Sequence, residues 1–127
     1  MAKDLTIIGA GPAGMTAALF AARSGTQVTL IDGNPSVGRK LLVTGAGRAN
    51  LTNRELSAER YTCSDRTWLE SVFSRFGFAE LTAFLESIGV LTYCTHDGCC
   101  YPLSESAQTV VQAFAAALNE VGVRLLL

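Results

Sequence analysis

The feature that most constrains this chain is a run of closely spaced glycines, GAGPAG at residues 9–14, which directly follows the apolar residues 5–8. A short apolar run of this kind is typical of a parallel strand that is buried on both faces. Gly9 permits a tight turn out of the strand, Gly11 lets the backbone approach a pyrophosphate, and Gly14 lets the next helix pack closely. The segment therefore predicts the start of a dinucleotide-binding βαβ unit.

A second strand and an acidic residue complete this pattern. Pro12 suits the first helical turn, because the N–H groups of that turn have no partner within the helix and proline has no N–H to leave unpaired. The helix should run to Ser24 and end at Gly25. Residues 27–31 are predicted to form the second strand, with Asp32 at its carboxyl end. An acid here accepts hydrogen bonds from a ribose diol and repels a 2′-phosphate, so FAD or NAD(H) is favoured over NADP(H). The alternative is a chance glycine-rich turn in an ordinary α/β domain.

Length and composition limit the classes of function. The 127 residues suit one domain, and a hydrophobic content of 49% is ample for a core. A net charge of −1 argues against a nucleic-acid partner that is held through its phosphates. We find neither an apolar run of about 20 residues for a membrane span nor the pattern of a signal peptide. We therefore expect a cytoplasmic protein with no membrane partner, while the oligomeric state is left open.

The four cysteines show no CxxC pair and no regular zinc spacing, so no metal site is predicted. Cys63 and Cys94 are isolated in the sequence, whereas Cys99 and Cys100 are neighbours. In a cytosolic chain we expect them to be reduced thiols packed around a hairpin. A redox or metal role, with His96 beside Cys94, Cys99 and Cys100, is the alternative.

Residues 33–53 change character, since they are rich in Gly, Asn and basic residues and show neither a helical nor a strand period. We interpret them as a long structured loop, and such loops are usually functional. Arg39, Lys40 and Arg48 supply positive charge that could contact phosphates. A solvated basic loop is the alternative.

Helical spacing returns after a linker at residues 54–62, with apolar stripes in residues 69–76 and 81–88 that are typical of core-facing helices. Residues 90–95 and 99–101 are predicted to pair as a hairpin.

The end of the chain combines a helix and a strand. Ser104 is a plausible N-cap for a helix that ends at Gly122. Residues 123–127 begin a further apolar strand, which would be the third parallel strand of a doubly wound sheet. Because an apolar strand is an unusual place for a domain to finish, we expect a partial domain.

Three segments, GAGPAG, GRKLLVTGAGRANLTN and DGCCYPLSESAQTVVQAF, together resemble the BaiN/RdsA-type family of NAD(P)/FAD-dependent oxidoreductases, which includes aminoacetone oxidases. The second segment is the most specific of the three. The resemblance covers essentially the whole chain but only about the first third of a typical member. It implies an FAD-binding Rossmann-like α/β fold divided into the βαβ unit (1–32), a flavin and phosphate loop (33–53), helices and a hairpin (54–122), and the start of a third strand (123–127).

The same resemblance implies the cofactor contacts. The glycine turn and the following helix would hold the FAD pyrophosphate, Asp32 the adenosine ribose, and the residues after Gly38 the phosphates, ribityl chain and flavin. The residues assigned in this way are Gly9, Gly11, Pro12, Ala13, Gly14, Asp32, Gly33, Arg39, Lys40, Thr44, Gly45, Gly47, Arg48 and Asn50. The family commonly has Cys in the GRxNLTN block, where this chain has Ala49.

The activity implied is flavin redox chemistry, in which NAD(P)H or a small-molecule substrate donates electrons. No acid, base or nucleophile can be assigned from the sequence, and His96 reads as a surface residue on a turn. The alternative is a truncated, non-catalytic remnant that keeps the dinucleotide-binding fold.

Overall fold

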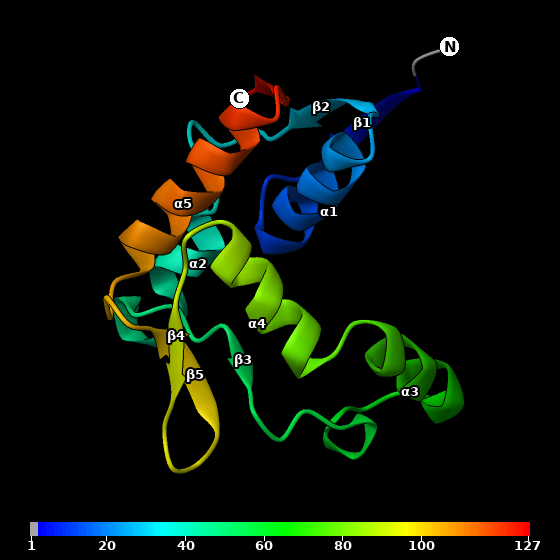
Figure 1. Cartoon of the computed structure of the whole chain (residues 1–127), viewed down its shortest axis with the longest axis vertical. Helices are drawn as coiled ribbons and strands as arrows, with labels where there is room; N and C mark the ends of the chain where they lie inside the picture. The colour runs from blue at the N-terminus through cyan, green and yellow to red at the C-terminus, as the bar shows by residue number, and fades with distance from the viewer. Residues whose placement is uncertain (1–2) are drawn as a thin grey trace. The chain divides into compact units, whose positions relative to one another are not determined.

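The computed structural model describes residues 3–127, which form two compact units (Figure 1). The first unit joins the chain up to Ala49 with Ser106–Leu127, and the second comprises Asn50–Glu105. Each unit contains its own three-stranded sheet.

The sheet of the first unit is parallel, with strand order β1-β2-β6. Its strands are β1 (Asp4–Ile8), β2 (Gln27–Ile31) and β6 (Arg124–Leu126). The first two strands and the late third strand are therefore confirmed. Together with the helices described next, they confirm the α/β fold class.

Three helices belong to this unit: α1 (Pro12–Arg23), α2 (Arg39–Val43) and α5 (Ala107–Glu120). Helix α1 packs on β1 and β2, and α5 packs along both α1 and α2. No helix within residues 3–127 has the length and apolar character needed to cross a bilayer. The core consists of apolar side chains from the strands and helices, among them Met15, Ala18, Leu19, Val28, Leu30, Val110, Phe114 and Leu118.

The expectation that residues 5–8 are buried on both faces is wrong. Leu5 is 40% exposed and Ile8 is 86% exposed. Helix α1 packs on β1 and β2, and even the central strand β2 alternates between buried and less buried side chains, so the helices cover one face of this sheet. Along β2, only Val28 and Leu30 are buried, which marks the covered face.

The prediction that residues 33–53 lack helix and strand is also wrong. The segment contains α2, the 3₁₀ helix η1 (Thr44–Gly47) and the short strand β3 (Thr52–Asn53). A five-residue helix spans little more than one turn and cannot display a helical period in its sequence. Helix α2 forms instead because Leu41 is buried and the helix packs against α5.

Helix α2 is preceded by a glycine, Gly38, in a tightly packed position. Gly38 has φ +71°, and a Cβ on it would lie 2.9 Å from Val111 Cγ2 and 3.3 Å from Met15 Cε. We expect Gly38→Ala to lower the free energy of unfolding by about 2–3 kcal/mol, from backbone strain and overpacking together. Gly122→Ala is the matched control, because Gly122 has φ +75° with nothing near its Cβ position. Equal losses in urea denaturation would show that the contact with Val111 does not matter.

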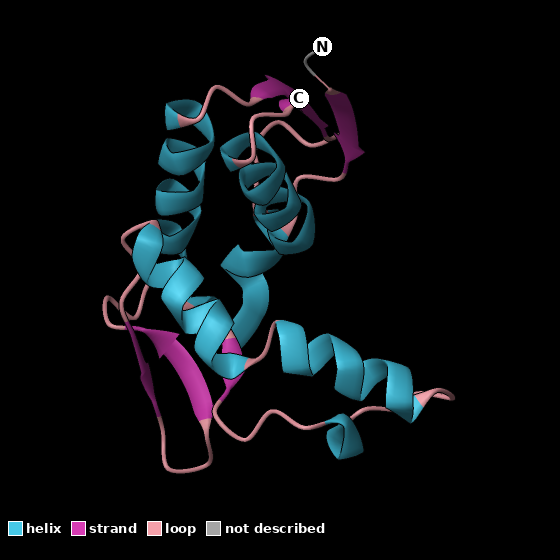
Figure 2. Cartoon of the chain, turned by 45° about the vertical axis from the view of Figure 1, so that its right-hand side comes forward, coloured by secondary structure: helices cyan, strands magenta, loops and turns pink. Residues whose placement is uncertain are grey.

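The second unit contains an antiparallel sheet in the order β3-β5-β4, with β4 (Thr92–Cys94) and β5 (Cys99–Pro102) forming the predicted hairpin. The two predicted helices are confirmed as α3 (Arg66–Arg75) and α4 (Phe78–Ser87), drawn in cyan in Figure 2. The predicted linker contains one short 3₁₀ helix, η2 (Ala58–Arg60).

The N-cap of α5 is Ser106, so the prediction of Ser104 is wrong. Glu105 adopts a left-handed backbone with φ +53°, and its N–H donates to Pro102 O at 2.9 Å. This turn separates Ser104 from the helix, which therefore begins two residues later than expected.

The prediction of reduced thiols is wrong for half of the cysteines. Cys94 and Cys100 form a disulfide, whereas Cys63 and Cys99 are free and half-buried. The strand register places Cys94 directly opposite Cys100, which spacing along the sequence does not reveal. Across residues 3–127, the structure brings together no group of three or more His, Cys, Asp or Glu side chains that could hold a metal ion.

Candidate functional site

The glycine turn between β1 and α1 is tightly fitted to its surroundings. Gly9 has φ +104°, and its N–H donates to Ile31 O at 2.7 Å, which fixes the turn to β2. A Cβ on Gly14 would overlap the carbonyl oxygen of Gly9 and lie 3.0 Å from its carbonyl carbon. A Cβ on Gly11, in contrast, would meet nothing within 4 Å. Gly14 is therefore needed by the fold, while Gly11 leaves its backbone accessible.

The N-terminus of α1 follows this turn. Pro12 occupies the first helical position, so it removes one N–H that would have no partner, and Ala13 and Gly14 lie in the first turn. Helix N-termini attract anions through such N–H groups and through the helix dipole. With the accessible backbone of Gly11 beside it, this end of α1 has the chemistry of a phosphate site.

Asp32 docks onto the glycine turn from the end of β2. Its Oδ2 accepts the N–H of Ala10 at 2.7 Å, and its Oδ1 accepts the backbone N–H and the side-chain N–H of Asn34, both at 2.8 Å. The hydrogen bond from Ala10, followed by those from Asn34, lowers the pKa of Asp32 below its ordinary value. The carboxylate is therefore ionised at neutral pH, and Oδ2 keeps a lone pair for a further donor.

Ala10 is held from both sides. Its N–H donates to Asp32, and its carbonyl oxygen accepts the N–H of Gly38 at 2.8 Å. Sequence reasoning missed Ala10, Asn34 and Gly38 as parts of this arrangement. The Asp-Gly-Asn sequence at residues 32–34 is a recognisable Asx-turn signal that could have identified Asn34.

Through Gly38, the start of α2 is tied to the glycine turn. Arg39 and Lys40 are the first residues of α2 and are exposed, and the charge of Arg39 helps to lower the pKa of Asp32. Gly33 is exposed beside Asp32. The structure therefore groups Gly33 and Arg39 with Asp32 and the glycine turn.

Residues 44–49 form a turn of their own. Gly45, Ala46 and Gly47 have φ values of +56°, +54° and +84°, and Ala49 has φ +61°. The turn is closed by the N–H of Ala49, which donates to Thr44 O at 3.1 Å, and by the backbone and side chain of Arg48, which both donate to Gly45 O. Left-handed alanines are strained and cluster at functional sites.

Asn50 differs from the other predicted site residues in the unit to which it belongs. Asn50 is exposed and belongs to the second unit, whereas the other predicted site residues belong to the first. Ala49, where the family commonly has Cys, is fully buried. In this chain, that position therefore packs in the interior of the first unit.

The parallel sheet, the glycine turn and the acid that follows β2 define a dinucleotide-binding Rossmann domain. The chain belongs to the family of the HI0933-like protein Rossmann domain, whose model matches residues 3–127, and this confirms the resemblance to the BaiN/RdsA-type FAD-dependent oxidoreductases.

Named relatives agree with this assignment. The chain is 36% identical to the 3-dehydro-bile acid delta(4,6)-reductase of Clostridium scindens over 94% of this chain and 29% of that protein. It is 28% identical to the ribosomal RNA dihydrouridine synthase of Haemophilus influenzae over 95% of this chain and 30% of that protein. The chain thus spans less than a third of the length of these relatives.

Among solved structures, THI4 of Thermovibrio ammonificans has the same fold. It superposes with a TM-score of 0.65 at 16% sequence identity, over 98% of this chain and 37% of that one.

Proposed function

We propose that this chain binds FAD and serves as the N-terminal part of a flavin-dependent oxidoreductase. The observation that carries the proposal is the glycine turn docked on Asp32, with the N-terminus of α1 beside an unobstructed Gly11. Gly11, Ala13 and Gly14 would hold the pyrophosphate through backbone N–H groups, with Pro12 fixing the first turn of the helix.

The charge around Asp32 favours FAD over NADP(H). An ionised carboxylate repels a 2′-phosphate, and its accessible lone pair suits a ribose hydroxyl. Arg39 and Lys40, at the exposed start of α2, would neutralise the negative phosphates. Gly33 adds no side chain beside the ribose.

The turn at residues 44–49, several of whose residues have a left-handed backbone, would contact the ribityl chain and the flavin. The family resemblance assigns Thr44, Gly45, Gly47 and Arg48 to the ribityl chain and flavin, together with Asn50. The turn's internal hydrogen bonds to Gly45 O and Thr44 O support this role, because they hold its backbone in one conformation.

When bound, FAD would supply two-electron redox chemistry, and NAD(P)H or a small-molecule substrate would be the electron donor. The residues of this chain would bind and orient the cofactor rather than transfer protons. The relatives named as a reductase and a synthase are consistent with a redox role.

The proposal predicts that the purified protein titrated with FAD shows saturable quenching of flavin fluorescence. Adding NADP⁺ together with FAD at matched concentration should leave the quenching unchanged, because Asp32 repels the 2′-phosphate. A protein that is colourless as purified and leaves the fluorescence of added FAD unchanged would refute FAD binding. Bound flavin that NAD(P)H cannot bleach under anaerobic conditions would favour the non-catalytic remnant or a different donor.

A further inference from the structure

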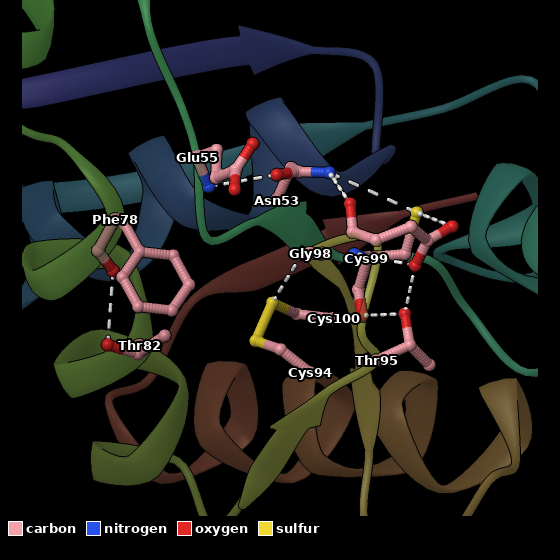
Figure 3. Close-up of a disulfide and its surroundings, with 10 residues drawn as sticks. Asn53, Glu55, Phe78, Thr82, Cys94, Thr95, Gly98, Cys99 and Cys100 are labelled. Carbon is pink, nitrogen blue, oxygen red and sulfur yellow. Dashed lines mark hydrogen bonds between the residues drawn. A yellow bond between two sulfur atoms is a disulfide. The ribbon is translucent and has the colours of Figure 1, made fainter.

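The hairpin of the second unit contains a disulfide at its turn end. Strands β4 and β5 are antiparallel, and their register pairs Cys94 with Cys100 (Figure 3). Side chains of directly opposed residues lie on the same face of a sheet. The bond encloses only the five residues between the two cysteines.

The two cysteines of the disulfide differ in exposure. Cys100 is fully buried, whereas Cys94 is half-buried on β4, which is an edge strand. Thiol–disulfide exchange requires an attacking thiolate to reach one of the two sulfurs. Reagents from solvent should therefore attack Cys94 Sγ and release Cys100.

Cys99 is next to Cys100 in the sequence, but its side chain points to the opposite face of β5 from the disulfide. Successive side chains along a strand point to opposite faces, so Cys99 and the neighbouring disulfide lie on different sides of β5. Its thiol is 3.7 Å from Asp97 Oδ2, and Asn53 Nδ2 lies 4.0 Å from its sulfur. Figure 3 shows Cys99 on the side of Asn53, away from the bond between Cys94 and Cys100. Cys99 is therefore not placed to exchange with the disulfide.

The hairpin turn has hydrogen bonds that do not depend on the disulfide. Thr95 N–H donates to Cys99 O at 2.9 Å, and Gly98 N–H donates to Thr95 O at 3.0 Å. Asn53 Nδ2 donates to Asp97 O at 3.3 Å, which anchors the turn to β3. We therefore expect the hairpin to persist when the disulfide is opened.

When the disulfide is reduced, the thiol of Cys100 has a hydrogen-bond acceptor within reach. Cys100 Sγ lies 3.2 Å from Gly98 O, where the S–H of a reduced Cys100 would donate a hydrogen bond. A buried thiol with an acceptor at this distance does not leave an unsatisfied polar group. Both redox forms are thus compatible with the same backbone.

From these observations we infer that Cys94–Cys100 is a thiol–disulfide exchange site whose reductant is a dithiol. A thiolate of the dithiol attacks Cys94 Sγ, the S–S bond breaks, and Cys100 leaves as a thiolate that takes up a proton. The second thiol of the reductant then attacks the reductant's first sulfur, which is bonded to Cys94 Sγ in the mixed disulfide. This closes the reductant's own disulfide and releases Cys94 as a thiolate, which takes up a proton. Two electrons and two protons pass to the protein, and the dithiol becomes a disulfide.

The test begins with the intact wild-type protein. Free thiols are blocked with N-ethylmaleimide, the folded protein is treated with dithiothreitol, and new thiols are labelled with iodoacetamide before peptide mapping. We expect the maleimide on Cys63 and Cys99, and the second label on Cys94 and Cys100. Maleimide on Cys94 before reduction, or a bond that dithiothreitol opens only after denaturation, would overturn the proposal.

Matched variants then test the direction of attack. With Cys100→Ser, the remaining thiol of Cys94 should form a mixed disulfide with oxidised glutathione about tenfold faster than the thiol of Cys100 does in Cys94→Ser. Cys99→Ser should leave the wild-type rate of reduction unchanged. Equal rates for the two single thiols, in variants whose circular dichroism matches wild type, would contradict attack at Cys94. In wild-type protein, a glutathione adduct trapped on Cys100 instead of Cys94 would do the same.

Discussion

Gly14→Ala is expected to destabilise the protein by about 3 kcal/mol or more, although alanine is the better helix former by about 1 kcal/mol. Gly14 lies within α1, where propensity alone would predict a gain. The added Cβ, however, would overlap Gly9 O, a backbone atom that cannot rotate away. Gly9 is itself hydrogen-bonded to Ile31, so relieving the overlap must move α1 away from the sheet or break the turn. Urea denaturation of the purified variant measures the loss.

Gly11→Ala is the matched control, and it separates folding from binding. Its Cβ would meet nothing within 4 Å, and its φ of −79° suits alanine, so stability should stay within about 0.5 kcal/mol of wild type. If a pyrophosphate approaches this backbone, FAD affinity should still fall about tenfold or more. A stable Gly11→Ala protein with wild-type FAD affinity would place the pyrophosphate elsewhere. A Gly14→Ala protein as stable as wild type would refute the close packing of α1.

Local sequence patterns were sufficient for most of the elements. The strand at residues 27–31 and the helix that ends near Ser24 were predicted because glycines bound them and their apolar residues follow a regular period. The five-residue helix α2 was missed because it is too short to show a period and depends on packing against α5. The exposure of Ile8 was missed because burial depends on which elements cover a strand.

The sequence pattern predicts individual site residues but not the hydrogen bonds that join them. It assigns roles to the glycines and Asp32, yet it does not show that Asp32 and Gly38 hold Ala10 from opposite sides. Residues 22 or more positions apart make these contacts, and such pairing requires the fold. The disulfide was missed for the same reason, since the register of β4 against β5 decides which cysteines face each other.

Asp32→Ala is expected to weaken FAD binding about tenfold to hundredfold, the range for losing a hydrogen bond to a charged group. The carboxylate accepts a hydrogen bond from the N–H of Ala10 in the glycine turn. It would also accept one from a ribose hydroxyl of FAD. Asn34→Ala is the matched control, because the backbone N–H of residue 34 can still donate to Asp32 after the change. Its FAD affinity should fall only a few-fold. Isothermal titration or fluorescence quenching with FAD measures both variants, and an unchanged affinity for Asp32→Ala would remove this residue from the site.

The same carboxylate predicts a dependence on pH. Hydrogen bonds lower the pKa of Asp32 in the folded protein, so its stabilising contribution is present above its ordinary value of 3.8 and is lost as the pH falls through the lower, folded-state pKa. In wild-type protein, the N–H of Ala10 should therefore exchange with solvent faster in that acidic range, after correction for intrinsic exchange. Asp32→Asn keeps an acceptor oxygen for Ala10 but cannot ionise, so its corrected exchange rate should stay constant over the same range. A constant rate in the wild type as well would mean that the charge of Asp32 contributes nothing to holding the glycine turn.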